Sequence, residues 1–267
     1  MPAGFENSAP DHSPHSALIK RQIVMAQGHV FTGTSGWSYD HWSGGFYPDG
    51  LPHKDWLVYY ARHLHSLEIN NSFYHLPDKK VLQQWYETVP DNFVFTAKAS
   101  RYITHMKKLK DPKTSVAAFF DRISVLDDKL GPIIFQLPPH WGFNPQRLEE
   151  FLCILSTDYR YAFEFRDHSW HNSQTLDLLK KYNAAFCIYE LDGFLSERDV
   201  TTDFVYVRLH GPNGAYQGCY DSRTLAGWAG AFSTWSAQGR DIYCYFDNDE
   251  EVYAARNALT LQSMLEK

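Results

Sequence analysis

Eight short runs of β-branched and aromatic residues alternate with segments of helical periodicity, and this alternation constrains the fold more than any other feature of the 267-residue chain. Such an arrangement is typical of βα units that build a parallel sheet. The runs predict strands over residues 30–35, 66–70, 93–99, 132–137, 161–165, 185–190, 204–210 and 242–246.

Helix signals fill the gaps between these runs. Asp78 is placed to cap a helix that extends to Glu87, and Asp111-Pro112 opens another helix that Gly131 ends. The periodicity predicts helices over residues 54–65, 79–87, 113–130, 145–155, 173–182, 221–237 and 250–265.

Eight βα repeats over residues 29–267 predict one domain of the α/β class, a (β/α)8 TIM-barrel-like fold. The link over residues 190–202 is too short and mixed for a crossover helix, so we expect a barrel slightly trimmed around its sixth βα unit. An open doubly wound sheet is the competing fold, but residues 33–37 match neither G-x-G-x-x-G nor a Walker loop. Residues 1–28, rich in Pro, Ser and His, predict a disordered leader.

Composition excludes several functional classes. The net charge of −6 gives no general attraction for polyanions, so nucleic acid is a partner that the charge does not favour. No apolar run is long enough to span a membrane, and the N-terminus lacks the pattern of a signal peptide. The four cysteines form no C-x-x-C pair and are expected to be reduced core residues of a cytoplasmic protein: Cys153, Cys187, Cys219 and Cys244.

Ionisable and amide side chains stand where the predicted strands end. In a TIM barrel these ends meet at one mouth, where active sites are built. Two interpretations remain open, an ion-paired plug that only fills the mouth and an active site. The residues concerned are Glu68, Asn70, Lys98, Gln136, Glu164, Arg166, Arg208, His210, Tyr245 and Asp247.

Seven ordered motifs resemble those of the domain-of-unknown-function 72 family. They are GTSGWSYDHWSGGFYP (33–48), EINNSFYHLP (68–77), FTAKASRYITH (95–105), LGPIIFQLPP (130–139), FEFRDHSW (163–170), FVYVRLHGP (204–212) and YFDND (245–249). The resemblance implies a TIM-barrel-like fold and brings no established reaction. By position, the family's polar set falls on Glu68, Asn70, Lys98, Arg101, Gln136, Glu164, Arg166, Arg208, His210 and Asn248.

Two positions depart from the family pattern. Asn71-Ser72 stand where the family usually has Ser and a hydroxyl residue, and Asp247 stands where it usually has Asn. Asp247 is therefore a weak candidate for a catalytic acid.

Three chemistries compete at the predicted mouth. A metal-dependent phosphodiesterase of the endonuclease IV type would take ligands from Glu68, Glu164, Asp247 and His210, but the interleaved cations would compete for these carboxylates, so no metal is expected. A Schiff-base lyase would need Lys98 with a depressed pKa. A glycosidase would pair Glu68 with Glu164 and use aromatic platforms, for which the candidates are Trp37, Trp42, Tyr74 and Trp170.

The cations favour an anionic ligand that carries phosphate or carboxylate, and the aromatics suit a base or sugar. The leading prediction is a cytoplasmic hydrolase-like enzyme, without a cofactor, that acts on a small or exposed phosphorylated or nucleotide-like substrate. The alternative is a protein that binds an anion or a nucleic-acid end without catalysis. Glu164, His210, Glu68 and Lys98 are the catalytic candidates. The binding candidates are Asn70, Arg101, Gln136, Arg166, Arg208, Asn248, Trp37, Tyr74 and Trp170.

Overall fold

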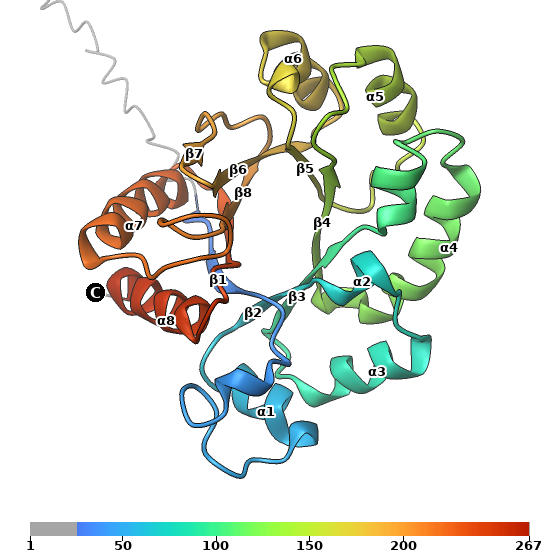
Figure 1. The fold of residues 1–267 in the computed structure, drawn as a ribbon. Coiled ribbons are helices and arrows are strands. Elements are labelled where there is room, and N and C mark those ends of the chain that lie inside the picture. Colours follow the sequence, from blue (N-terminus) through green and yellow to red (C-terminus); the bar gives the residue numbers. More distant parts are fainter. Residues whose placement is uncertain (1–25, 267) are drawn as a thin grey trace, which may run out of the picture.

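A closed barrel of eight parallel strands forms the centre of the protein (Figure 1). The structure, a computed structural model, describes residues 26–266. A ninth, short strand, β7, pairs with β6 in antiparallel orientation. The strands are β1 (Val30–Ser35), β2 (Ser66–Ile69), β3 (Val94–Lys98), β4 (Leu130–Leu137), β5 (Tyr161–Phe165), β6 (Ala185–Leu191), β7 (Phe194–Leu195), β8 (Phe204–Leu209) and β9 (Asp241–Phe246).

The ring closes because β1 pairs with both β2 and β9, and β5 pairs with β6. The α-helices lie outside this ring (Figure 1). They are α1 (Trp56–Ala61), α2 (Asn71–Tyr74), α3 (Lys79–Thr88), α4 (Lys113–Ile123), α5 (Pro145–Leu152), α6 (Ser173–Lys181), α7 (Ser222–Ala237) and α8 (Tyr253–Leu265). The 3₁₀ segments are η1 (Asp40–Trp42), η2 (His53–Asp55), η4 (Ser124–Lys129) and η5 (His168–Trp170), and η3 (Tyr102–Met106) is a π-helix.

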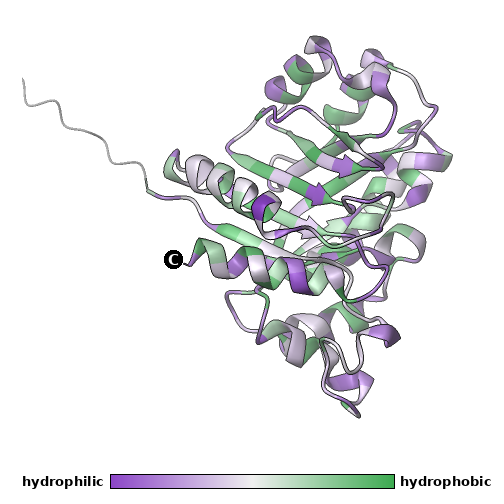
Figure 2. Cartoon of the chain, turned by 60° about the vertical axis from the view of Figure 1, so that its left-hand side comes forward, coloured by the Kyte–Doolittle hydropathy of each residue, from purple (hydrophilic) through white to green (hydrophobic). Residues whose placement is uncertain are grey.

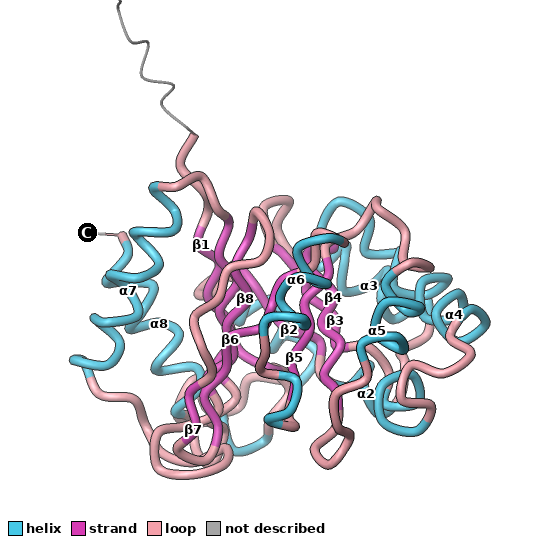
Figure 3. Tube along the Cα trace, turned by 90° about the horizontal axis from the view of Figure 1, so that it is seen from above, coloured by secondary structure: helices cyan, strands magenta, loops and turns pink. Residues whose placement is uncertain are grey.

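The predicted (β/α)8 architecture is confirmed, and all eight predicted strands are present within a few residues of their expected bounds. The link after β6 contains the β6–β7 hairpin and no α-helix, which agrees with the expected trimming. Figure 3 shows β7 at the end of the barrel opposite to the start of β1. Of the predicted leader, only residues 26–28 lie within the described part of the chain.

Several predicted helix ends are wrong. Gly131 does not end a helix, because α4 stops at Ile123, a 3₁₀ segment follows, and Gly131 lies inside β4. The predicted start of α3 is confirmed, because Asp78 is its N-cap residue, but the Asp78 side chain makes no capping bond; its carboxylate accepts a hydrogen bond from Arg122 at 3.0 Å. The last helix begins at Tyr253, three residues later than predicted.

Two apolar layers hold the barrel. The larger layer lies between strands and helices, and the smaller one fills the barrel interior with side chains such as Ile134, Tyr206 and Tyr245. The interior tyrosines keep their hydroxyls bonded, Tyr206 to Thr96 at 3.0 Å and Tyr245 to Ser66 at 2.6 Å. In Figure 2 the strands are mainly hydrophobic, with hydrophilic segments towards their arrowheads. The polar side chains therefore gather at the carboxyl end of the barrel.

The cysteines are all free, but only Cys187 and Cys244 are buried. Cys153 and Cys219 are exposed, so the prediction of four core cysteines is wrong for these two. Cys153 directly follows the last residue of α5 and faces outwards although its sequence neighbours are apolar. Within residues 26–266 no helix is long and apolar enough to cross a membrane.

Candidate functional site at the mouth of the barrel

The centre of the mouth is occupied by the guanidinium of Arg208, which projects inwards from β8 and is fully buried. Its Nη2 atom donates to Glu68 at 2.8 Å and to Asp247 at 3.0 Å, and its Nη1 atom donates to Glu164 at 2.8 Å. Arg208 therefore ties together carboxylates from β2 and β5 and from the end of β9. Every nitrogen of this guanidinium has a protein acceptor.

Glu164 is also bonded to Arg166, two residues further along the chain. Burial by itself would raise the pKa of Glu164, but the adjacent charges of Arg166 and Arg208 hold that pKa well below the usual carboxyl range. Glu164 thus stays ionised, and its carboxylate is fully buried. A group held in this state is poorly suited to act as a general acid near neutral pH.

His210 lies between the two arginines. Its Nε2 atom is 3.0 Å from Nη2 of Arg166 and 3.3 Å from Nη1 of Arg208. Since guanidinium nitrogens can only donate, Nε2 must accept, which places the imidazole proton on Nδ1. That atom lies 3.0 Å from Asp247 Oδ2, although off the line of a good hydrogen bond. The imidazole is fully buried.

Both carboxylate oxygens of Glu68 likewise already accept hydrogen bonds from neighbouring side chains. Its carboxylate accepts from Ser35, from Tyr206 at 2.7 Å and from Arg208. Asp247 is 8% exposed; burial would raise its pKa, but His210 and Arg208 lower it. Glu68 therefore serves the buried ion-pair network. Asp247 joins this network through its Oδ2 atom and also lines the mouth cavity that Lys98 faces.

Lys98 differs from its neighbours because its charge has no direct partner. The amine lies 4.2 Å from the centre of the Phe73 ring, and among residues 26–266 it makes no hydrogen bond or ion pair. Burial, followed by the charge of Arg208, lowers the pKa of Lys98 to about 8. Lys98 also lines a cavity of about 420 Å³ at the mouth, together with Tyr39, Asn70 and other residues.

A strained segment after β3 brings further groups towards Lys98. Arg101 directly precedes the π-helix η3 and is exposed, while His105 within η3 packs edge-on against Phe73 at 4.9 Å. Burial and the charges of Lys98 and Arg101 lower the pKa of His105 to about 4. The next turn holds non-glycine residues in the left-handed region, at Lys108, Leu109 and Asp111. π-helices and strained backbone are frequent at functional sites.

Asp249 is a candidate that sequence reasoning missed. It lines the 420 Å³ cavity with Lys98, accepts a hydrogen bond from the Trp42 indole at 2.6 Å and lies 3.3 Å from His41. Burial raises the pKa of Asp249 to about 6, although Trp42 and His41 act in the opposite direction. A signal was present, because Asp249 follows Asp247 by two residues in YFDND. His105 was likewise present in a quoted motif but was not selected.

The remaining predicted site residues divide into two groups. Asn70 and Tyr74 line the mouth cavity, and Gln136 lies on β4 beside Glu164 in register. Trp37 lies next to the mouth in a second cavity. Asn248 and Trp170 are engaged elsewhere: the Asn248 amide donates to Gly218 and Asn257, and the fully buried Trp170 donates to the carbonyl of Trp141.

The geometry does not assemble metal ligands. Within residues 26–266 no group of three or more His, Cys, Asp or Glu side chains is arranged to hold a metal ion. The four side chains considered for an endonuclease-like centre are instead interleaved with Arg166 and Arg208. The chemistry available at the open cavity is that of the Lys98 amine, three carboxyl groups, two amides and tyrosine rings. The carboxyl groups belong to Asp247, Asp249 and Glu250, and the amides to Asn70 and Gln217.

Comparison with known proteins decides the family. The model of the family described as "Protein of unknown function DUF72" matches residues 31–267. The chain belongs to the DUF72 family. A DUF72 family protein of Thermotoga maritima has a similar crystal structure, with a TM-score of 0.81 and 28% identity over 90% of this chain and all of that chain. One from Enterococcus faecalis shares the fold, with a TM-score of 0.76 and 21% identity over 89% of this chain and 96% of that chain.

Two sequence relatives of this DUF72 protein carry UPF0759 names. UPF0759 protein YunF of Bacillus subtilis is 24% identical over 89% of this chain and 95% of its own length. UPF0759 protein YecE of Escherichia coli K12 is 33% identical over 44% of this chain and 47% of its own length. These similarities establish the family and its barrel fold.

Proposed function

We propose that this DUF72 protein binds a small phosphorylated or nucleotide-like anion at the mouth of its barrel and acts on it there. The observation that carries the proposal is Lys98, a buried amine that faces the mouth cavity without a salt bridge among the described residues. A lone buried charge costs free energy of several kcal/mol, which a ligand anion would offset. Arg101, exposed three residues further along the chain, is a second cation whose charge, like that of Lys98, acts on His105.

Asp249 and Lys98 are the acid/base candidates for such a reaction. Their pKa values, about 6 and about 8, lie on either side of neutrality, whereas Glu164 is locked as an ion. This assignment replaces Glu164 and His210 in our proposal, because both of these are fully buried. With four free cysteines, we place the protein in the cytoplasm.

Burial and hydrogen bonds hold the side chains of Glu68, Glu164 and His210 in place. This supports a second candidate function, a binding protein without catalysis. A panel of phosphoester, glycoside and aldol substrates separates the two. Turnover that disappears in Asp249→Asn supports the enzyme, and binding without turnover supports the binding protein.

The test of anion binding is thermal unfolding of the wild type and of Lys98→Met, with and without inorganic phosphate. We expect phosphate to stabilise the wild type but not Lys98→Met. The variant without ligand should be at least as stable as the wild type, because it no longer buries a charge. Lys180→Met, which removes an exposed lysine from α6, is the matched control and should respond like the wild type. Equal stabilisation of all three proteins, or of none, would contradict the proposal.

The pH dependence of binding provides a second measurement. An anion held by the Lys98 amine should bind more weakly as the pH rises above about 8, by up to about tenfold per pH unit, since the amine loses its proton. Sulfate is the suitable probe because its own charge is constant over this range. Sulfate affinity that does not change between neutral and alkaline pH would argue against Lys98 as the anchor.

A further inference from the structure

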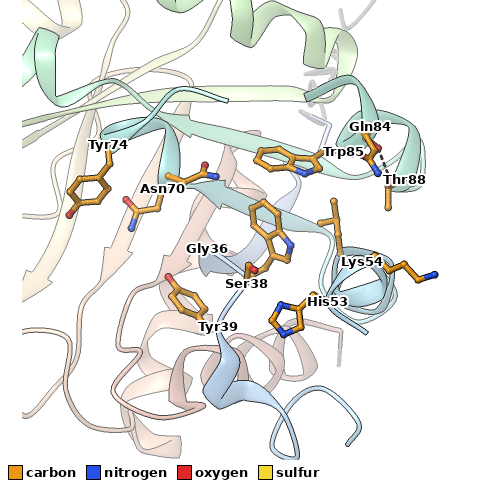
Figure 4. Close-up of a pocket in the computed structure, with 13 residues that line it drawn as sticks. Gly36, Ser38, Tyr39, His53, Lys54, Asn70, Tyr74, Gln84, Trp85 and Thr88 are labelled. Atoms are coloured by element: carbon orange, nitrogen blue, oxygen red, sulfur yellow. Dashed lines mark hydrogen bonds between the residues drawn. The ribbon is translucent and has the colours of Figure 1, made fainter. Parts of the chain in front are cut away.

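A second cavity, of about 580 Å³, adjoins the mouth. Figure 4 shows its walls, which come from the segment after β1, from α2 and from α3. Tyr39, Asn70 and Tyr74 line both this cavity and the 420 Å³ cavity that contains Lys98. Because the two cavities share these three residues, one ligand of moderate length can occupy both.

The side cavity has aromatic walls. Trp37 and Trp85 are both half-buried and meet edge to face, with ring centres 4.8 Å apart and planes at 90°. Neither indole N–H donates a hydrogen bond within residues 26–266, so both donors are free for a ligand. Leu57 adds an apolar contact. Such walls suit a flat ring, because stacking on aromatic faces favours heterocycles of many kinds.

Polar groups stand at the border of the two cavities. The Oδ1 atom of Asn70 is buried and has no hydrogen-bond donor within the described residues. An unpaired buried acceptor costs free energy, which a ligand hydroxyl or N–H group would recover. Figure 4 places Asn70 between Tyr74 and the tryptophan side of the cavity. Asp249 offers a second acceptor on the mouth side.

We infer that the side cavity lined by Trp37 and Trp85 holds the heterocyclic ring of a ligand whose anionic group lies at Lys98, so that the ligand class is a nucleoside monophosphate. This inference rests on the proposed function, since Lys98 provides the anion site. The order of groups along the two cavities is cation, hydrogen-bond acceptor and aromatic wall. A nucleoside monophosphate presents the complementary order of phosphate, sugar hydroxyls and base.

The test compares four probes on the wild type: inorganic phosphate, ribose 5-phosphate, adenosine and AMP. We expect AMP to bind about ten- to hundredfold more tightly than ribose 5-phosphate, which is the gain from stacking one base. Titration calorimetry gives the affinities, and quenching of tryptophan fluorescence by AMP provides an independent signal. AMP that binds no more tightly than ribose 5-phosphate would overturn the inference.

Two variants test whether the heterocyclic ring of AMP binds in the side cavity. Trp85→Leu removes an aromatic wall, and Ser38→Phe fills the cavity from an exposed position without removing any packed group. Both should lose most of the advantage of AMP over ribose 5-phosphate and keep the affinity for ribose 5-phosphate itself. Trp235→Leu, which alters a half-buried tryptophan on α7, is the control and should keep that advantage. An advantage that survives both cavity variants contradicts the assignment.

The outcomes separate this inference from the proposed function. If phosphate and ribose 5-phosphate bind in a manner that depends on Lys98 while AMP gains nothing, the ring site fails and the anion site stands. If adenosine binds and neither phosphate nor ribose 5-phosphate does, the anion site fails and the ring site alone is supported.

Discussion

Arg208 shows how one side chain can organise the mouth of a barrel. Its guanidinium is fully buried and contacts three carboxylates, each from a different strand or strand end. Buried ion pairs of this kind contribute little net stability compared with apolar packing, but breaking them is costly because a partner charge is left unpaired. The geometry supports a structural role for Arg208.

Arg208→Met is therefore expected to lower the free energy of unfolding by about 3 to 5 kcal/mol, because it leaves Glu68, Glu164 and Asp247 without their shared cation. Chemical denaturation with and without phosphate measures this loss, which should be similar in both conditions. Arg256→Met, on an exposed part of α8, should change stability little. A stable variant that has lost only phosphate binding would restore Arg208 as a ligand anchor.

The carboxyl group of Asp249 should make the free energy of unfolding depend on pH. Its pKa rises from 3.8 to about 6 on folding, mainly through burial, so between these values the folded state binds more protons than the unfolded state. The contribution of Asp249 to the free energy of unfolding is fully present below about pH 4. It is lost as the pH rises through about 6. The loss is on the order of 3 kcal/mol.

Asp249→Asn cannot ionise, so its stability relative to wild type should increase as the pH rises across this window. Denaturation midpoints at closely spaced pH values measure the difference. Asp177→Asn, which changes an exposed carboxylate on α6, provides the comparison. Parallel pH profiles for the wild type and Asp249→Asn would show that burial does not raise this pKa.

Among the elements, the loop from β8 to α7 packs against His210 through Tyr216. It places the Tyr216 ring 5.5 Å from the imidazole, edge to face, with Tyr216 itself in the left-handed region. The loop begins at Gly211, whose φ is +114°, and a Cβ there would lie 2.2 Å from the carbonyl oxygen of Gln217. Only glycine fits this close approach without displacing the loop.

Gly211→Ala should therefore displace the loop and lower the free energy of unfolding by about 1 to 3 kcal/mol. Hydrogen exchange should show faster exchange of the amides between Gly211 and Tyr220. Gly227→Ala is the opposite case, because it adds a methyl group inside α7 where nothing lies within 4 Å. That variant should gain roughly 0.5 to 1 kcal/mol. Unchanged exchange in Gly211→Ala would show that the loop adapts without strain.

Over the molecule as a whole, the buried carboxylates at the mouth already have cationic partners. Arg208 contacts Glu68, Glu164 and Asp247, and Arg166 also contacts Glu164. A divalent cation added to this set would have to displace an arginine from its carboxylates.

We expect elemental analysis of the purified protein to show less than one transition-metal ion per chain, and chelation to leave the unfolding midpoint unchanged. A known zinc protein treated in parallel checks the chelation. Stoichiometric zinc or manganese, together with a midpoint that falls on chelation, would favour the endonuclease-like centre.

Local sequence patterns were sufficient to predict the barrel. Strands such as residues 161–165 and 242–246 were placed within one residue of the observed β5 and β9, because their short apolar runs are bounded by turn residues. Helix ends were harder. Asp78 marks the start of α3 as predicted, although a distant partner, Arg122, engages its carboxylate. Gly131 is a residue type that often ends helices, but pairing with β3 extends β4 through this position.

For the candidate site, strand periodicity predicted which side chains face the mouth, because every second residue of a strand points to the same side. It could not predict how their charges pair. Arg208 and Lys98 are both cations at strand ends, yet one is saturated by carboxylates from distant segments and the other faces a cavity. Pairing and access depend on distances between residues far apart in the chain, and only closure of the barrel brings those residues together.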